Sequence, residues 1–159
     1  MVDLKLNEEL PLNEHTKMNV RRIKGNLRLV AFGKTSQVSK SSGWTDTGFS
    51  TKTIFDSNYI SEGVSSGYFR FLKSGKYLFI WQQRAQDSIA GQGVGIWLTS
   101  TDANDNMLMC WGGNKYRDTL QGMFFWNVNA GEEMKTKGYG DAAYTSKPIS
   151  VWVFAVVGL

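Results

Sequence analysis

The sequence predicts an all-β domain, an antiparallel β-sandwich or jelly roll, on the strength of three observations. Aromatic residues make up 13% of the 159 residues, which favours strands over helices. The chain has 17 glycines and only 2 prolines, a balance that indicates many tight turns. Apolar stretches of strand length recur about eight to ten times between turn-forming residues, a spacing typical of a sandwich or jelly roll and not of a parallel α/β sheet.

The first 17 residues differ from the rest of the chain. Residues 1–17 are polar with irregularly spaced leucines, and Pro11 interrupts them, so they predict an arm or attachment segment. Residues 18–159 form the predicted head domain. It begins with strand-like residues 19–23 and 27–32 on either side of a glycine turn, which indicates a hairpin.

The middle of the chain predicts a loop and then strands of increasing clarity. Residues 33–43 are rich in Ser, Lys and Gly and predict a loop, whereas the apolar residues within 44–55 indicate short, irregular strands. Two clear strands follow at residues 68–72 and 77–83, with a turn at residues 73–76 between them.

The second half of the chain predicts more strand pairs. Residues 94–99 and 107–111 indicate a hairpin with a polar tip. Residues 119–128 and 133–137 predict two further strands joined by a turn, and residues 150–157 predict the last strand.

Two of the predicted strands are apolar on both faces. Aromatic residues alternate with Leu78 and Ile80 in the strand at 77–83, and small aliphatic residues alternate with Trp152 and Phe154 in the last strand. One face fills the core, and the other needs a second layer, because a large exposed apolar patch is costly. Two interpretations remain open, namely a closed homo-oligomer that buries this face and a central strand within a monomer.

The titratable residues predict no enzyme, no catalytic residue and no cofactor. His15 is the only histidine and lies in the polar arm, so no Ser/His/Asp triad or His-based metal site is expected. Cys110 is the only cysteine, and its apolar neighbours predict a packed, inert thiol. Carboxylates for glycoside hydrolysis would have to come from Glu132, Glu133 or Asp141, which a turn and a solvated strand explain more simply.

Other motifs favour structural interpretations. An oxygen-rich run offers ligands for Ca²⁺ but lacks the EF-hand spacing, so a hairpin tip is preferred and no metal is predicted. This run contains Asp102, Asn104, Asp105 and Asn106. The glycine-rich residues 91–95 lead into a strand, which excludes a phosphate-binding loop. A formal charge of +4 with dispersed basic residues argues against a nucleic-acid partner, and no apolar run is long enough for membrane insertion.

A set of aromatic and planar polar residues in predicted loops is the candidate ligand-binding site. Aromatic rings pack against the C–H faces of neutral sugars, while amide, guanidinium and carboxylate groups bind the hydroxyls. The alternative is that these residues cap the core or line subunit contacts. The candidates are Trp111, Asn114, Tyr116, Arg117, Tyr139, Asp141 and Tyr144.

From residue 64 to residue 159, the order of segments resembles the trimeric jelly-roll family of complement-type globular heads and tumour necrosis factors. The resemblance lies in the strand opening at 74–79, the segment at 94–98 before a polar turn, the segment at 120–133 with its turn, and the apolar last strand. It implies a jelly roll that assembles as a homotrimer. The chain departs from the family pattern where it ends Val157-Gly158-Leu159 in place of Phe-Ser-Gly.

Residues 20–27 are similar to a strand, Gly-Asn turn and strand found in the heads of phage tail and baseplate proteins. Such heads are trimers that recognise host cell-surface saccharides or anchor neighbouring baseplate proteins. The resemblance implies a non-enzymatic receptor-binding, carbohydrate-recognition head of a phage tail or virion-surface protein, assembled in the host cytoplasm and located in the virion. The alternative left open is a structural adaptor whose arm joins a larger assembly and whose head docks other virion proteins.

Overall fold

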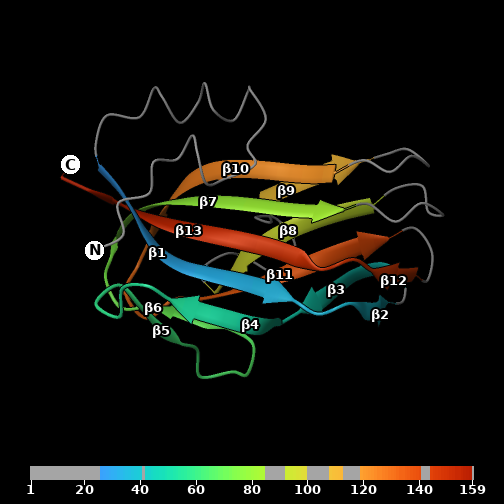
Figure 1. Cartoon of the computed structure of the whole chain (residues 1–159), viewed down its shortest axis with the longest axis horizontal. Helices are drawn as coiled ribbons and strands as arrows, with labels where there is room; N and C mark the ends of the chain where they lie inside the picture. Colours follow the sequence, from blue (N-terminus) through green and yellow to red (C-terminus); the bar gives the residue numbers. More distant parts are fainter. Residues whose placement is uncertain are drawn as a thin grey trace.

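Two antiparallel sheets packed face to face contain most of the strands (Figure 1). The computed structural model describes residues 26–40, 42–84, 92–99, 108–112, 119–140 and 144–158. These residues form thirteen strands and no helix, so the prediction of an all-β jelly-roll sandwich is confirmed. Accordingly, the described part of the chain contains no helix suited to spanning a membrane.

The first sheet, called the β7 sheet, holds the last strand at its centre. Its strands are antiparallel in the order β10 (Thr119–Val128), β7 (Gly75–Arg84), β13 (Ile149–Val157), β1 (Asn26–Thr35) and β4 (Phe49–Ile54). Strand β13 therefore bonds to β7 on one side and to β1 on the other. The predicted strands at 77–83, 119–128 and 150–157 are confirmed by β7, β10 and β13.

The second sheet, called the β11 sheet, is built around one long strand. Its order is β5 (Ile60–Glu62), β6 (Phe69–Phe71), β11 (Glu133–Gly140), β8 (Gln92–Leu98) and β9 (Leu108–Gly112), and β3 (Gly43–Thr47) also pairs with β11. The antiparallel pair β8 and β9 confirms the predicted hairpin at 94–111. A separate two-stranded sheet joins β12 (Tyr144–Ser146) to β2 (Val38–Lys40).

The main core lies between the two sheets. From the β7 sheet it receives Tyr77, Phe79 and Trp81, which are at most 2% exposed. The β11 sheet contributes Ile96 and Met134, among others, and both are fully buried. Aromatic rings pack against one another in this core. Phe79 stacks on Phe124 of β10 with ring centroids 4.9 Å apart, a favourable separation for an aromatic pair.

A second apolar cluster lies on the opposite face of the β7 sheet. Strand alternation places Leu78 and Ile80 of β7 beside Phe154 of β13 on this face, and all three are at most 3% exposed. Partly buried apolar residues pack against them, namely Leu27, Met123, Phe125 and Trp152. The prediction that β7 and β13 are apolar on both faces is therefore confirmed.

The predicted loop at residues 33–43 is wrong in part, because β1 continues to Thr35 and β2 follows. The Ser, Lys and Gly composition is typical of a loop, but Gly33 is a strand residue that packs against two core rings. A Cβ there would lie 2.5 Å from the ring of Phe49 and 2.8 Å from that of Phe69. Glycine therefore leaves room for both rings while its backbone pairs with Val151. The predicted arm at 1–17 and the strand at 19–23 lie outside the described residues.

The residues at 68–72 and 77–83 do form strands, but they do not pair with each other. Strand β6 belongs to the β11 sheet and β7 to the β7 sheet, so the intervening turn carries the chain across the sandwich. Likewise, β10 and β11 lie in different sheets on either side of the turn at Gly131, whose φ is +93°. Both turns therefore create the two layers.

Gly122 is required by the ring of Trp81, and this gives a test of the packing. A Cβ at Gly122 would lie 1.9 Å from that ring, so Gly122→Ala forces the indole out of its place. We expect the free energy of unfolding to fall by about 1–3 kcal/mol, the usual cost of overpacking. Denaturant unfolding measures the change. Gly75→Ala is the matched control, because its Cβ would meet only Tyr77 at 3.9 Å; equal losses for both variants would contradict this account.

Candidate functional site

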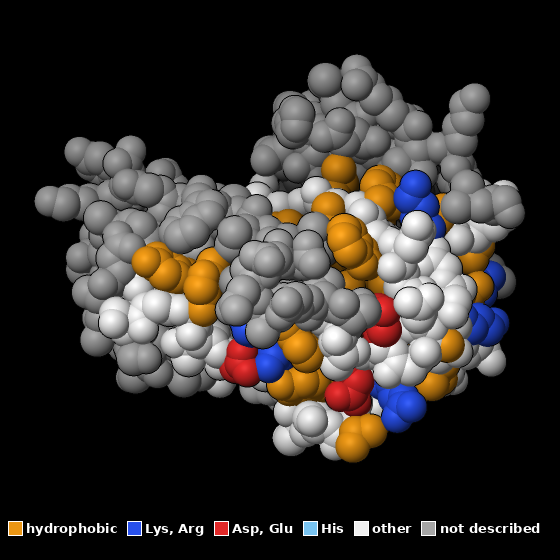
Figure 2. Space-filling view, turned by 180° about the vertical axis from the view of Figure 1, so that it is seen from behind, with side chains coloured by type: hydrophobic (Ala, Val, Ile, Leu, Met, Phe, Trp, Pro, Cys, Tyr) orange, Lys and Arg blue, Asp and Glu red, His pale blue; other side chains and the backbone are white. Residues whose placement is uncertain are grey.

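The outer face of the β11 sheet carries a mixed aromatic and charged surface. Along β11, Met134 and Thr136 face the core, so the alternate residues Lys135, Lys137 and Tyr139 lie on the other face. The register places aromatic or acidic residues of β3 and β8 next to them: Trp44 with Tyr139, Asp46 with Lys137, and Trp97 with Lys135. Viewed from behind in Figure 2, the molecule shows apolar, acidic and basic side chains gathered close together.

Trp44 and Tyr139 form an aromatic pair at one end of this surface. Their ring centroids are 5.2 Å apart and the rings are tilted by 52°. Both residues are half-buried, so each is packed in place while part of its surface remains accessible. Such a pair offers flat apolar faces to the C–H face of a sugar or to an apolar side chain of a partner.

Lys135 lies at the other end, between two aromatic rings. Its Nζ is 4.5 Å from the centroid of Trp97 and 5.1 Å from that of Tyr68, and the residue is only 7% exposed. The ammonium also forms an ion pair with Asp46. Burial acts to lower the pKa of Lys135, but the hydrogen bonds and charge attraction of Asp46 and Tyr68 outweigh it and raise that pKa above its ordinary value. The ammonium is therefore a permanent charge at neutral pH.

Asp46 links the two halves of the surface. Its second oxygen lies 3.6 Å from Nζ of Lys137, and its side chain is 55% exposed. One carboxylate thus pairs with two ammonium groups, which leaves these three side chains with a net charge of +1. The exposed part of the Asp46 side chain can meet hydrogen-bond donors from solvent or ligand. The aromatic and charged residues of this surface are together called the outer-face cluster. Its seven members are Trp44, Asp46, Tyr68, Trp97, Lys135, Lys137 and Tyr139.

The outer-face cluster suits binding better than catalysis. Its only carboxylate is already paired with lysines, and none of its seven side chains is a hydroxyl or thiol nucleophile activated by a base. Over the described residues, no three His, Cys, Asp or Glu side chains come together as a metal site would require. Aromatic faces beside a half-exposed carboxylate are features of recognition surfaces for neutral polar ligands.

The structure brings together two of the predicted ligand-binding residues. Gly93 of β8 pairs with Tyr139 of β11 on one side and with Trp111 of β9 on the other. The three residues therefore lie in one row across the three neighbouring strands. Tyr144 belongs to a different sheet, where it is the register partner of Lys40 in the β12 and β2 pair. The remaining candidates, Asn114, Tyr116, Arg117 and Asp141, lie outside the described residues.

Sequence reasoning missed Trp44, Asp46 and the lysines of β11. The signal for the lysines was present, because Lys135, Lys137 and Tyr139 alternate in a strand whose other face is buried. Trp44 and Asp46 could not be joined to them, since no local pattern reveals that β3 pairs with β11.

The carboxylates considered for hydrolysis have structural roles in the described residues. Glu132 is 7% exposed and accepts a hydrogen bond from Asn129 Nδ2 at 3.2 Å. Glu133 accepts the backbone N–H of Val64 and so ties β11 to the loop before β6. The glycine-rich segment enters strand β8, as predicted, and Cys110 lies in β9 opposite Val94. His15 and the run at 102–106 lie outside the described residues.

No family model matches the sequence, and no curated protein is similar enough to count as a relative. Solved structures do share the fold. Murine APRIL superposes with a TM-score of 0.58 at 12% identity, covering 80% of this chain and 98% of that chain. The globular domain of the zebrafish complement 1qA protein gives a TM-score of 0.56 at 14% identity over 82% and 98% of the two chains.

A tumour necrosis factor of another animal extends this comparison. The Eiger TNF from S. frugiperda superposes with a TM-score of 0.52 at 12% identity, covering 83% of this chain and 96% of that chain. The chain therefore has the jelly-roll fold of complement globular heads and tumour necrosis factors. The resemblance noted in the sequence is confirmed at the level of fold.

Asp46→Asn tests the charge balance of the outer-face cluster. We expect the free energy of unfolding to fall by about 1 kcal/mol at neutral pH, because the buried Lys135 ammonium loses its charge partner. Because folding raises the pKa of Lys135, this contribution is complete below the ordinary value of 10.5 and is lost as the pH rises through the folded value. Denaturant unfolding of both proteins at neutral and high pH should therefore show their stabilities converging; a constant difference would contradict the assignment.

Proposed function

We propose that this chain is a non-enzymatic recognition head that assembles as a homotrimer and binds a saccharide on its outer-face cluster. In the fuller form of the proposal, the head belongs to a phage tail or virion-surface protein and binds a bacterial envelope saccharide. The phage setting rests on the sequence resemblance at residues 20–27 alone. The observation that carries the recognition role is the cluster itself, where an aromatic pair adjoins a half-exposed carboxylate on a rigid sheet.

The trimer is supported by the second apolar cluster on the β7 sheet. A sheet of a sandwich needs only one apolar face, yet Leu78 and Phe154 complete an apolar layer on the side away from the core. Met123 and Phe125 at its edge are only partly buried, so this face has apolar surface to offer a neighbouring subunit. Subunits related by a closed rotation would cover it on every copy.

Met123→Glu tests the proposed subunit contact. A charge on this face has to be desolvated in the trimer but not in the monomer, so we expect dissociation into monomers with an unchanged β-sheet circular dichroism spectrum. Light scattering measures the mass. Phe55→Glu is the control, because Phe55 is 47% exposed and lies outside the second cluster, and it should leave the trimer intact. A wild-type protein with the mass of one chain would refute the trimer.

Trp44→Ala and Tyr139→Ala test the saccharide surface. We expect each to weaken binding about fivefold, because each removes an aromatic face worth roughly 1 kcal/mol against a sugar ring. An array of bacterial envelope saccharides identifies the ligand, and titration calorimetry gives the affinities. Phe55→Ala removes an exposed ring elsewhere and should bind normally.

The array also separates recognition from the adaptor alternative. A trimer that binds none of the saccharides would contradict the recognition role. In that case, deletion of residues 1–17 should abolish co-assembly with other virion proteins, which is the behaviour of an adaptor. A recognition head should keep its saccharide affinity after the same deletion.

A further inference from the structure

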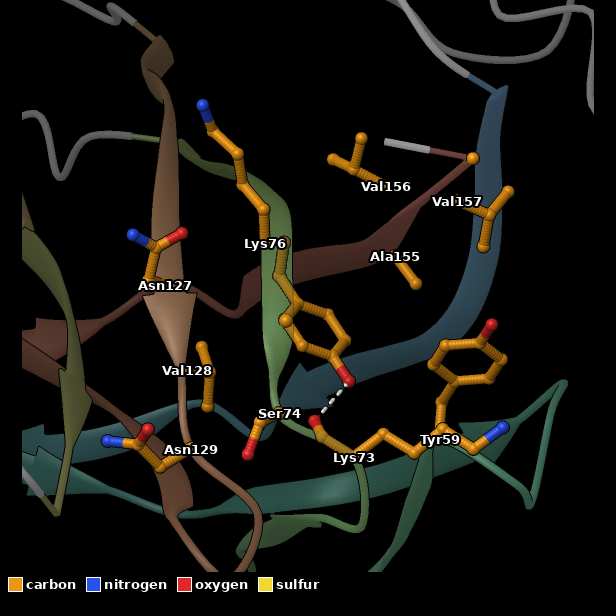
Figure 3. A pocket seen from close by; sticks show the side chains of 13 residues that line it. Tyr59, Lys73, Ser74, Lys76, Asn127, Val128, Asn129, Ala155, Val156 and Val157 are labelled. Atoms are coloured by element: carbon orange, nitrogen blue, oxygen red, sulfur yellow. Dashed lines mark hydrogen bonds between the residues drawn. The ribbon is translucent and has the colours of Figure 1, made fainter.

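A hollow of about 590 Å³ opens at the end of the β7 sheet where β7 begins and β10 and β13 end (Figure 3). Its volume lies in the usual range for small-molecule sites. It is formed by the turn before β7, by the last residues of β10 and β13, and by Tyr59. The side chains that matter below are those of Tyr59, Lys73, Lys76, Asn127, Asn129 and Val157.

The described residues that line the hollow carry positive charge and no acidic group. Lys73 and Lys76 are among them, and none of them is an aspartate or glutamate. Nζ of Lys73 lies 4.5 Å from the ring centroid of Tyr59, and Nζ of Lys76 lies 5.4 Å from that of Phe125. Within the part of the chain that the structure describes, neither ammonium forms an ion pair. Both can therefore bind an anion that comes from outside.

The wall that carries these lysines is held in place by hydrogen bonds. The hydroxyl of Tyr77 donates to the backbone oxygen of Lys73 at 2.8 Å, and Ser74 Oγ accepts the backbone N–H of Ala130 at 2.9 Å. Burial, with a smaller effect from Tyr59, raises the pKa of Tyr77 to about 12, so this donor keeps its proton at physiological pH. The turn is thus anchored to both β7 and the turn after β10.

The rest of the lining suits a sugar chain. Asn127 and Asn129 supply amide groups for hydroxyls, whereas Ala155 and Val157 supply an apolar wall for C–H faces. Figure 3 shows the ammonium of Lys73 beside Tyr59 and that of Lys76 well apart from it, at the other end of the hollow. One small anion cannot engage both lysines at once, but an extended ligand with repeated charges can.

We propose that this hollow binds an acidic oligosaccharide, with one carboxylate at Lys73, another at Lys76 and the sugar rings between them. The site is separate from the outer-face cluster, which lies on the other sheet. The inference therefore goes beyond the proposed binding of a neutral saccharide there. Lys76 alternates with Leu78 on the face of the second apolar cluster, so the hollow borders the proposed subunit contact and has to be tested on the assembled protein.

Titration calorimetry with trigalacturonate tests the proposal, and its fully methyl-esterified form serves as the matched ligand without charge. We expect saturable binding of the acid and at least about tenfold weaker binding of the ester. The double variant Lys73→Ala/Lys76→Ala should lose at least about tenfold in affinity for the acid. The control Lys34→Ala/Lys147→Ala removes the same charge from another hollow and should bind normally.

Four results would overturn the proposal. They are absence of trigalacturonate binding, equal affinity for acid and ester, equal affinity for trigalacturonate and inorganic phosphate, and equal losses in the two double-lysine variants. The Trp44→Ala variant keeps this test apart from the one above, because it should bind trigalacturonate normally even where it has lost the saccharide found on the array. Light scattering on each variant checks that the assembly is unchanged.

Discussion

The structure depends on one constraint, namely that β7 and β13 are apolar on both faces. Two adjacent central strands of this kind need apolar neighbours on both sides of their sheet. The inward face meets the β11 sheet and forms the main core around Phe79 and Trp81. The outward face, around Leu78 and Phe154, forms a second layer of apolar side chains. The centre of that face is already buried within the single chain, so a partner subunit would bury the partly exposed residues around it, such as Met123 and Phe125. Each Å² of apolar surface removed from water there would favour association by roughly 25 cal/mol.

The β11 sheet differs from the β7 sheet in having one apolar face. Its inner face packs in the main core, and its outer face presents aromatic and charged side chains. The surface is not simply solvated, since Lys135 is almost fully buried beneath Trp97 and Tyr68. Asp46 makes that burial tolerable by supplying the opposite charge. A rigid, partly desolvated polar surface of this kind is preorganised for recognition.

The sequence predicts the strands well where alternation is strong and fails where contacts are long-range. Local patterns predict the strands at 77–83 and 150–157, which are apolar on both faces, and the hairpin at 94–111. In each strand, successive side chains point to opposite faces, so the sequence itself shows which residues share a face. The extension of β1 was hidden because Gly33 and Ser-rich neighbours resemble a loop, although two distant rings require the glycine. In the candidate site Tyr139 was predicted, but Trp44 was not, since their contact depends on the pairing of β3 with β11.

The two candidate binding surfaces differ in whether a carboxylate lies beside their lysines, and the ligand chemistry that we propose for each follows from this difference. In the outer-face cluster, Asp46 already pairs with Lys135 and Lys137, so an acidic ligand would have to compete with that carboxylate for both ammonium groups. A neutral ligand avoids this competition. At the end of the β7 sheet, Lys73 and Lys76 lie against aromatic rings, whose attraction for cations is weak. Within the described residues neither lysine forms an ion pair, so both ammonium groups are available to an anion. In our two proposals, the arrangement of charge, more than shape, therefore distinguishes the surface for a neutral saccharide from the hollow for an acidic one.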